Sequence, residues 1–189
     1  NAPTGNKIYL YYVRLGDEDL GDQFGDMFSL NGATVTDSQT HREWTTCALG
    51  QESDSAHCLT TASTFTFCEP EDALCAANAA CAELNDDPNY GTEGNWRVPR
   101  LSELNQIISC NGQFATPLNT YFSNDHTCSE HDSNGAVIVD AFFPDTPSAP
   151  FWTAEAVGDN DAWAIDFSTG EHIVAPQDSE YHVRCVRGP

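Results

Sequence analysis

The spacing of apolar residues predicts two helices and one strand that is apolar on both faces. Apolar side chains recur at three- and four-residue steps over residues 69–84 and again over residues 102–110. Pro70 suits the first turn of the earlier helix, and Pro99 disfavours helical backbone just before the later one. Residues 7–15 are apolar or aromatic at nearly every position, so we expect a strand that is covered on both sides.

Three later segments alternate with the period of two that is typical of strands, and we expect them to form a central antiparallel sheet. In the middle segment, Trp163, Ile165 and Phe167 would share one face of the sheet. Residues 154–161 and 169–180 are polar and are predicted as the loops between these strands. The three segments are residues 151–153, 162–167 and 181–186.

A tight hairpin is predicted near the start of the chain. Asn31-Gly32 lies between the apolar segments 27–30 and 33–36, and this dipeptide favours a two-residue turn. The strand over 7–15 precedes this hairpin, and its apolar residues leave two alternatives. In the first alternative, residues 7–15 form an inner strand of the same domain. In the second, they pair with a neighbouring subunit. The residues that would carry such an assembly strand are Ile8, Leu10, Tyr12 and Val13.

Charge and cysteine content limit the partners and the compartment. The 189-residue chain carries 29 acidic and 7 basic residues, and this net charge of −22 should repel nucleic acids and other polyanions. Its eight cysteines form no Cys-x-x-Cys pair, which favours disulfides in an oxidising, extracellular compartment. We find no transmembrane run and expect no direct membrane insertion. Because the chain starts at Asn1, we expect a processed product whose targeting segment is gone.

Several segments in order resemble one bacterial domain family, which is named after the C-terminal domain of the Legionella collagen-like adhesin. The resemblance runs from about Met27 to Gly188 and implies a C-type-lectin-like α+β fold, with two helices packed on a twisted antiparallel sheet and long loops. We therefore divide the chain into an N-terminal strand and acidic linker (1–26) and a lectin-like domain (27–189). The resemblance rests on Asn31-Gly32-Ala33-Thr34-Val35, Glu43-Trp44, Trp96-Arg97-Val98-Pro99, Phe151-Trp152-Thr153, Ala162-Trp163-Ala164-Ile165-Asp166-Phe167 and Val183-Arg184-Cys185-Val186-Arg187.

The resemblance also implies two disulfides. Lectin-like folds tie the first helix to the last strand, which corresponds here to Cys81–Cys185, and family members suggest that Cys47–Cys58 closes a small arm. Proximity in the sequence suggests Cys68–Cys75 and Cys110–Cys128 for the rest. Eight cysteines allow 105 pairings, so an exchange of roles between Cys75 and Cys81 stays open.

The loops beside the sheet are where lectin-like folds commonly bind ligands, so they supply the candidate site. This chain lacks the Glu-Pro-Asn, Gln-Pro-Asp and Trp-Asn-Asp motifs of calcium-dependent sugar-binding lectins, and calcium-dependent binding is not implied. The alternative that these segments are ordinary polar turns stays open. The candidate ligand-binding residues are Trp152, Glu155, Asp159, Asn160, Asp161, Trp163, Gln177 and Asp178.

Neither a metal site nor a catalytic site can be assembled from the sequence. The acidic residues of 17–26 could bind Ca²⁺, but they lack the ordered spacing of an EF-hand loop. His126 and His131 flank Cys128, but without the spacing of zinc ligands. No Gly-x-Ser-x-Gly, His-Glu-x-x-His or phosphate loop occurs. We therefore expect no enzyme, no certain cofactor and only a possible role for Ca²⁺.

Two functions remain in contention. The first is a secreted or cell-surface adhesion module that binds a glycan, extracellular matrix or a host surface. The second is a structural subunit that self-associates into an extracellular filament or surface assembly through residues 7–15. Deletion of the N-terminal residues would distinguish them.

Overall fold

The computed structural model describes residues 27–54, 56–67, 76–91, 94–110, 113–114 and 135–189. Several predictions concern residues outside these ranges and stay untested. They are the strand over 7–15, the acidic linker, the pair Cys68–Cys75, the pairing of Cys110 with Cys128, and the histidines near Cys128.

A four-stranded antiparallel sheet joins the beginning and the end of the described chain. Its order is β1-β2-β3-β11. The predicted hairpin is confirmed, because Asn31 pairs with Thr34 across a turn in which Gly32 has a φ of 68°. Val186 pairs with Trp44 on the opposite edge of this sheet. The strands are β1 (Phe28–Asn31), β2 (Thr34–Asp37), β3 (Glu43–Thr45) and β11 (Val186–Arg187).

The second sheet is the predicted central sheet, but one of its strands differs from the prediction. Its order is β10-β9-β8, with β8 over Pro150–Val157, β9 over Asp161–Asp166 and β10 over Glu171–Pro176. The third strand therefore lies inside the predicted loop 169–180. The prediction that 181–186 would be this strand is wrong, because that segment makes only isolated bridges with Phe65 and Phe151 before it joins β3.

The first predicted helix is confirmed where the structure describes it. Helix α2 spans Ala76–Glu83, and its Ala77 and Cys81 are buried as expected. The 3₁₀ turns η1 (Leu84–Asp86) and η2 (Pro88–Tyr90) follow it. Residues 69–75 lie outside the described part.

The second predicted helix is shorter than its apolar spacing indicates. Helix α3 spans Leu101–Leu104 and continues as the 3₁₀ turn η3 (Asn105–Ile107). The backbone then becomes extended at Ile108, which forms a bridge with Ile138, and enters β6 (Ser109–Cys110), which pairs with β7 (Gln113–Phe114). Ile108 is therefore buried by a contact with a distant segment of the same chain, and not by a further helical turn.

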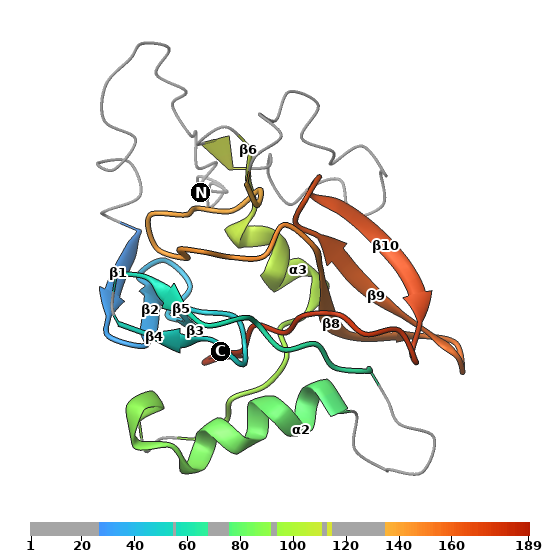
Figure 1. Ribbon diagram of the computed structural model, residues 1–189, viewed down its shortest axis with the longest axis horizontal. Helices are drawn as coiled ribbons and strands as arrows, with labels where there is room; N and C mark the ends of the chain where they lie inside the picture. The colour runs from blue at the N-terminus through green and yellow to red at the C-terminus, as the bar shows by residue number, and fades with distance from the viewer. Residues whose placement is uncertain (1–26, 55, 68–75, 92–93, 111–112, 115–134) are drawn as a thin grey trace, which may run out of the picture.

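Two hydrophobic clusters lie on the two faces of the β10-β9-β8 sheet. Phe151, Ile165 and Phe167 belong to a cluster that includes residues of α3, η3 and the first sheet. Trp152 and Ala164 belong to the other cluster, together with Trp96 and the buried side of α2. Figure 1 shows the two sheets on opposite sides of α3, with α2 along another side of the molecule. The sheet is therefore covered on both faces along β8 and β9, whereas the edge strand β10 is mostly exposed or only partly buried.

Two disulfides link elements that are far apart or weakly packed. Cys81–Cys185 joins α2 to the segment that leads into β11, with a sequence separation of 104. Cys47–Cys58 closes the arm that carries β4 (Glu52–Ser53) and β5 (Cys58–Leu59). Both are the pairs that the resemblance implies. The described chain is thus an α+β molecule with short helices, mostly antiparallel sheets and disulfide bonds.

No helix within the described ranges is both long enough and apolar enough to cross a membrane.

Candidate functional site

The Trp163 surface, which we define as Asp161, Trp163, Val174 and Pro176, occupies one face of the β9–β10 hairpin. Trp163 pairs directly with Val174, and Asp161 pairs with Pro176. Residues two apart on a strand point to the same side, so all four side chains lie on one face. Val174 is 46% exposed, and Trp163 is partly exposed. An aromatic ring and an aliphatic side chain therefore meet solvent together at this place.

Trp163 differs from the other three tryptophans of the chain in its surroundings. The indole N–H groups of Trp152 and Trp96 donate to backbone carbonyls, and Trp44 is fully buried. The Trp163 indole N–H has no acceptor among the residues that the structure describes. A tryptophan with an apolar ring and an unused polar N–H at the surface is suited to a ligand that offers both kinds of contact.

The Asp161 carboxylate is also without a partner in the described part of the chain. Its backbone carbonyl accepts a hydrogen bond from the Gln177 side chain at 3.0 Å, and its backbone pairs with Val157 and Pro176 in the sheet. The carboxylate lies on the same face as Trp163 and is partly exposed. It can therefore accept a hydrogen bond or pair with a cation from outside.

Glu155 holds the start of α3 against the sheet. One carboxylate oxygen, Oε2, accepts the backbone N–H of Leu101 at 2.9 Å. The first N–H groups of a helix have no partner within the helix, so a carboxylate there satisfies one of them. Glu155 therefore positions α3 beside the Trp163 surface and is only partly available to a ligand.

Trp152 was a candidate ligand-binding residue, but its side chain is turned away from solvent. Trp152 is fully buried, and its indole N–H donates to the Phe65 carbonyl at 2.7 Å. Its ring packs against Phe67 and Tyr181 at centroid distances of 5.5 and 4.6 Å. The alternation along β8 turns Trp152 toward the second cluster and away from solvent.

The other predicted site residues come together at one end of the sheet. Asp159 and Asn160 lie in the turn between β8 and β9, and the Asn160 carbonyl accepts the backbone N–H of Gln177 at 2.8 Å. Asp178 follows in the next turn and is exposed, as are Asp159 and Asn160. These residues form a polar rim beside the Trp163 surface.

Sequence reasoning missed Val174 and Pro176 because their segment was predicted as a loop. Glu171 and Gln177 give this segment a polar character, but an edge strand tolerates such residues because it faces solvent. The neighbouring β-branched residues Ile173 and Val174 were the signal that could have indicated a strand.

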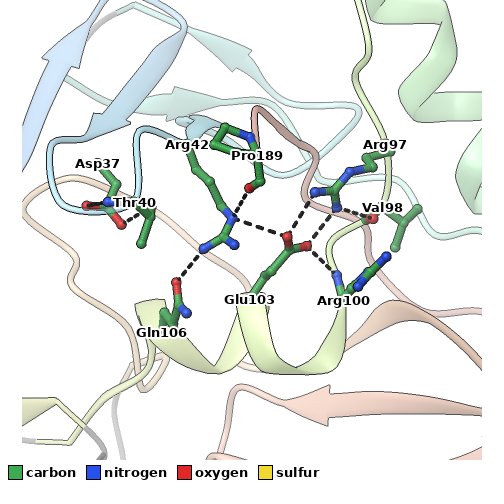
Figure 2. Close-up of polar contacts among 9 residues, drawn as sticks. All are labelled: Asp37, Thr40, Arg42, Arg97, Val98, Arg100, Glu103, Gln106 and Pro189. Carbon is green, nitrogen blue, oxygen red and sulfur yellow. Dashed lines mark hydrogen bonds and ion pairs between the residues drawn. The ribbon is translucent and has the colours of Figure 1, made fainter. Parts of the chain in front are cut away.

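A buried charge cluster fixes the segment that leads into α3. Glu103 accepts two hydrogen bonds from Arg97, at 2.7 and 2.8 Å, and pairs with Arg42 at 3.1 Å. It also accepts the backbone N–H of Arg100 (Figure 2). Burial favours the neutral acid, but the hydrogen bonds from Arg97 and Arg100 outweigh it and lower the pKa of Glu103. The side chains of Arg42 and Arg97 are therefore used in ion pairing with Glu103.

Arg184 is a second buried anchor, and it has no carboxylate partner in the described ranges. Its guanidinium donates to the carbonyls of Thr45 and Thr46 and to the Thr146 hydroxyl, and it lies 4.9 Å from the centre of the Phe143 ring. Burial lowers the pKa of Arg184 to about 9, so the group is still cationic at neutral pH. Carbonyl dipoles and an aromatic face replace a counter-ion here.

Within the described residues, no group of three or more His, Cys, Asp or Glu side chains is placed to hold a metal ion.

The chain matches the model of one protein family but matches no curated protein. Residues 33–187 match the family model described as the Lcl C-terminal domain. No curated protein matches the chain. The family match covers most of the chain and includes all strands of the Trp163 surface.

Proposed function

The chain belongs to the Lcl C-terminal domain family, and from this premise we propose that it is a ligand-binding adhesion module that acts outside the bacterial cell. The observation that carries the proposal is the partly exposed Trp163, which has an unused N–H and lies beside the exposed Val174. The two disulfides support an oxidising location. The proposed ligand is a glycan or a component of a matrix or host surface.

A lectin-like scaffold is part of the proposal. The link from α2 to the final strand through Cys81–Cys185 supports it, as does the position of the three-stranded sheet between two clusters. The role is proposed to be binding without catalysis. Glu103 is buried and paired with the partly exposed Arg97, so its carboxylate is occupied by this ion pair, whereas proton transfer needs a group that reaches a substrate.

The test is binding of the full chain to a broad glycan array at physiological salt, with Ca²⁺ and again with chelator. We expect selective binding to at least one glycan class. Loss of binding in chelator would show that the acidic loops hold a cation. A blank array under all conditions would contradict the proposed function.

A structural subunit of an extracellular assembly is the second candidate, and one observation favours it. β1 is an edge strand of the described four-stranded sheet, and its Leu30 is 39% exposed. An exposed edge strand can pair with a strand from another chain. The proposed partner is the segment 7–15 of a neighbouring copy.

Deletion of residues 1–15 tests this second candidate. If the segment joins subunits, the truncated chain stays folded and monomeric while the full chain assembles, as light scattering and electron microscopy would show. An unfolded product would show that the segment belongs to its own domain. A full chain that is itself monomeric, together with unchanged glycan binding by the truncated chain, would favour the adhesion module.

A further inference from the structure

We propose that the Trp163 surface binds glycans that contain cationic hexosamine units, in which the sugar amine is not acetylated. The inference rests on the proposed binding function and assigns its site and its ligand class. It follows from the juxtaposition of a partly exposed indole, an exposed aliphatic side chain and an unpaired carboxylate on one face of the β9–β10 hairpin.

The shape of the surface suits the flat side of a sugar ring. Trp163 and Val174 are directly opposite each other on neighbouring antiparallel strands, so their side chains are in contact range. Together they offer a shallow apolar platform that is open at the edge strand β10. The Trp163 N–H can donate to a sugar hydroxyl, because no described residue accepts it.

The charge around this platform selects among sugars. Asp161 lies two residues before Trp163 on β9 and points to the same face. No described residue forms a hydrogen bond or ion pair with its carboxylate. Glu155 is less available to a ligand, because it accepts the Leu101 N–H and its charge interacts with that of Arg97. Asp161 is therefore the carboxylate within the Trp163 surface that is available to a ligand.

An ammonium group matches both features of the site. A cation is attracted to the face of tryptophan more strongly than to other aromatic rings, and a carboxylate forms a charge-assisted hydrogen bond with it. The net charge of −22 adds a long-range attraction for cations and repels sulfated or carboxylated glycans. A hexosamine offers the amine together with a ring that can lie on the platform.

The experiment measures the affinity of the full chain for a glucosamine hexamer and for its N-acetylated counterpart by calorimetry at physiological salt. The variants are Trp163→Ala, Trp163→Phe and Asp161→Asn. Asp140→Asn is the matched control, because Asp140 is exposed outside the Trp163 surface and its replacement removes the same charge. Thermal melting of each variant confirms that it is folded.

We expect the glucosamine hexamer to bind more tightly than the acetylated hexamer. Trp163→Ala should weaken its binding about tenfold, and Asp161→Asn about threefold to tenfold. Trp163→Phe, which keeps a ring but loses the N–H, should have an intermediate effect. Asp140→Asn should stay within about twofold of the wild type.

Other results would overturn the inference in distinguishable ways. Equal affinity for both hexamers would reject the cationic ligand class. If a folded Trp163→Ala variant binds the glycan with wild-type affinity, the glycan binds at another site. That result rejects the Trp163 surface and leaves the proposed binding function intact. Tighter binding of a lysine hexapeptide than of the glucosamine hexamer, with the same dependence on Trp163, would assign the surface to a basic peptide. Failure to bind any glycan would remove the proposed function itself.

Discussion

At the scale of single residues, the four tryptophans divide into three that are buried in the interior and one that is partly exposed. Trp44, Trp96 and Trp152 are buried, whereas Trp163 is partly exposed. The same residue type therefore serves packing at one position and is available to a ligand at another.

This division predicts unequal effects on stability. Trp152→Ala removes a fully buried ring and its hydrogen bond to Phe65, and should lower the free energy of unfolding by about 4 kcal/mol. Trp163→Ala should lower it less, by about 2 kcal/mol, because part of that ring is solvated already. Urea denaturation of both variants measures the difference. A larger loss for Trp163→Ala would contradict the described orientation of β9.

Glu103 makes the folded state sensitive to acid. Its pKa is lowered in the folded protein, so its contribution is present above the unfolded pKa and is lost as the pH falls through the folded value. Glu103→Gln should lower the free energy of unfolding at neutral pH by about 2 kcal/mol, because Arg97 and Arg42 lose their partner.

Between neutral pH and about pH 3, the free energy of unfolding should fall less for Glu103→Gln than for the wild type. Denaturation curves across this range measure both effects. Glu83→Gln is a suitable control, since Glu83 is exposed on α2. A wild type and a Glu103→Gln variant with parallel pH profiles would contradict the role assigned to the cluster.

At the scale of elements, the disulfides stabilise parts of the chain that packing alone holds weakly. In the chain-entropy model, the long loop closed by Cys81–Cys185 contributes about 4.7 kcal/mol. The short loop closed by Cys47–Cys58 contributes about 3 kcal/mol. Loss of the first should also release α2 from the final strand.

Paired alanine variants test this order. Cys81→Ala with Cys185→Ala should be the more destabilised double variant in urea, and Cys47→Ala with Cys58→Ala the less destabilised one. The reverse order would indicate that native packing around α2 compensates for the lost link.

Local signals predicted some elements well and others only in part. The Asn31-Gly32 turn and α2 were predictable because each depends on residues within one short segment. The end of the second helix was not, because Ile108 has helical spacing but is buried by a bridge with Ile138, thirty positions away. The strand β10 was hidden by its polar residues at a sheet edge.

The residues of the candidate site, like the secondary-structure elements, were predicted only in part from the sequence. Trp163 and Asp161 were expected from the resemblance, and the structure places them on one face. Trp152 was misassigned, because the sequence does not show that Phe65, Phe67 and Tyr181 cover its face of the sheet. Val174 became visible only when β10 paired with β9.

At the scale of the whole molecule, the layers of the fold determine which part of the central sheet can meet a ligand. One face of the sheet packs on the cluster with α2, and the other packs on α3 and the first sheet. The β9–β10 hairpin extends beyond this cover at Trp163 and Val174. An acidic molecule with a partly exposed aromatic at this place is suited to a cationic or neutral ligand more than to a polyanion.

The central claim is that ligand binding takes place at Trp163. The most direct test is to follow the four indole N–H signals of the ¹⁵N-labelled chain by NMR during titration with the glucosamine hexamer. We predict that the Trp163 signal shifts progressively and that the signals of Trp44, Trp96 and Trp152 change little. A saturating titration in which the Trp163 signal stays fixed would contradict this account.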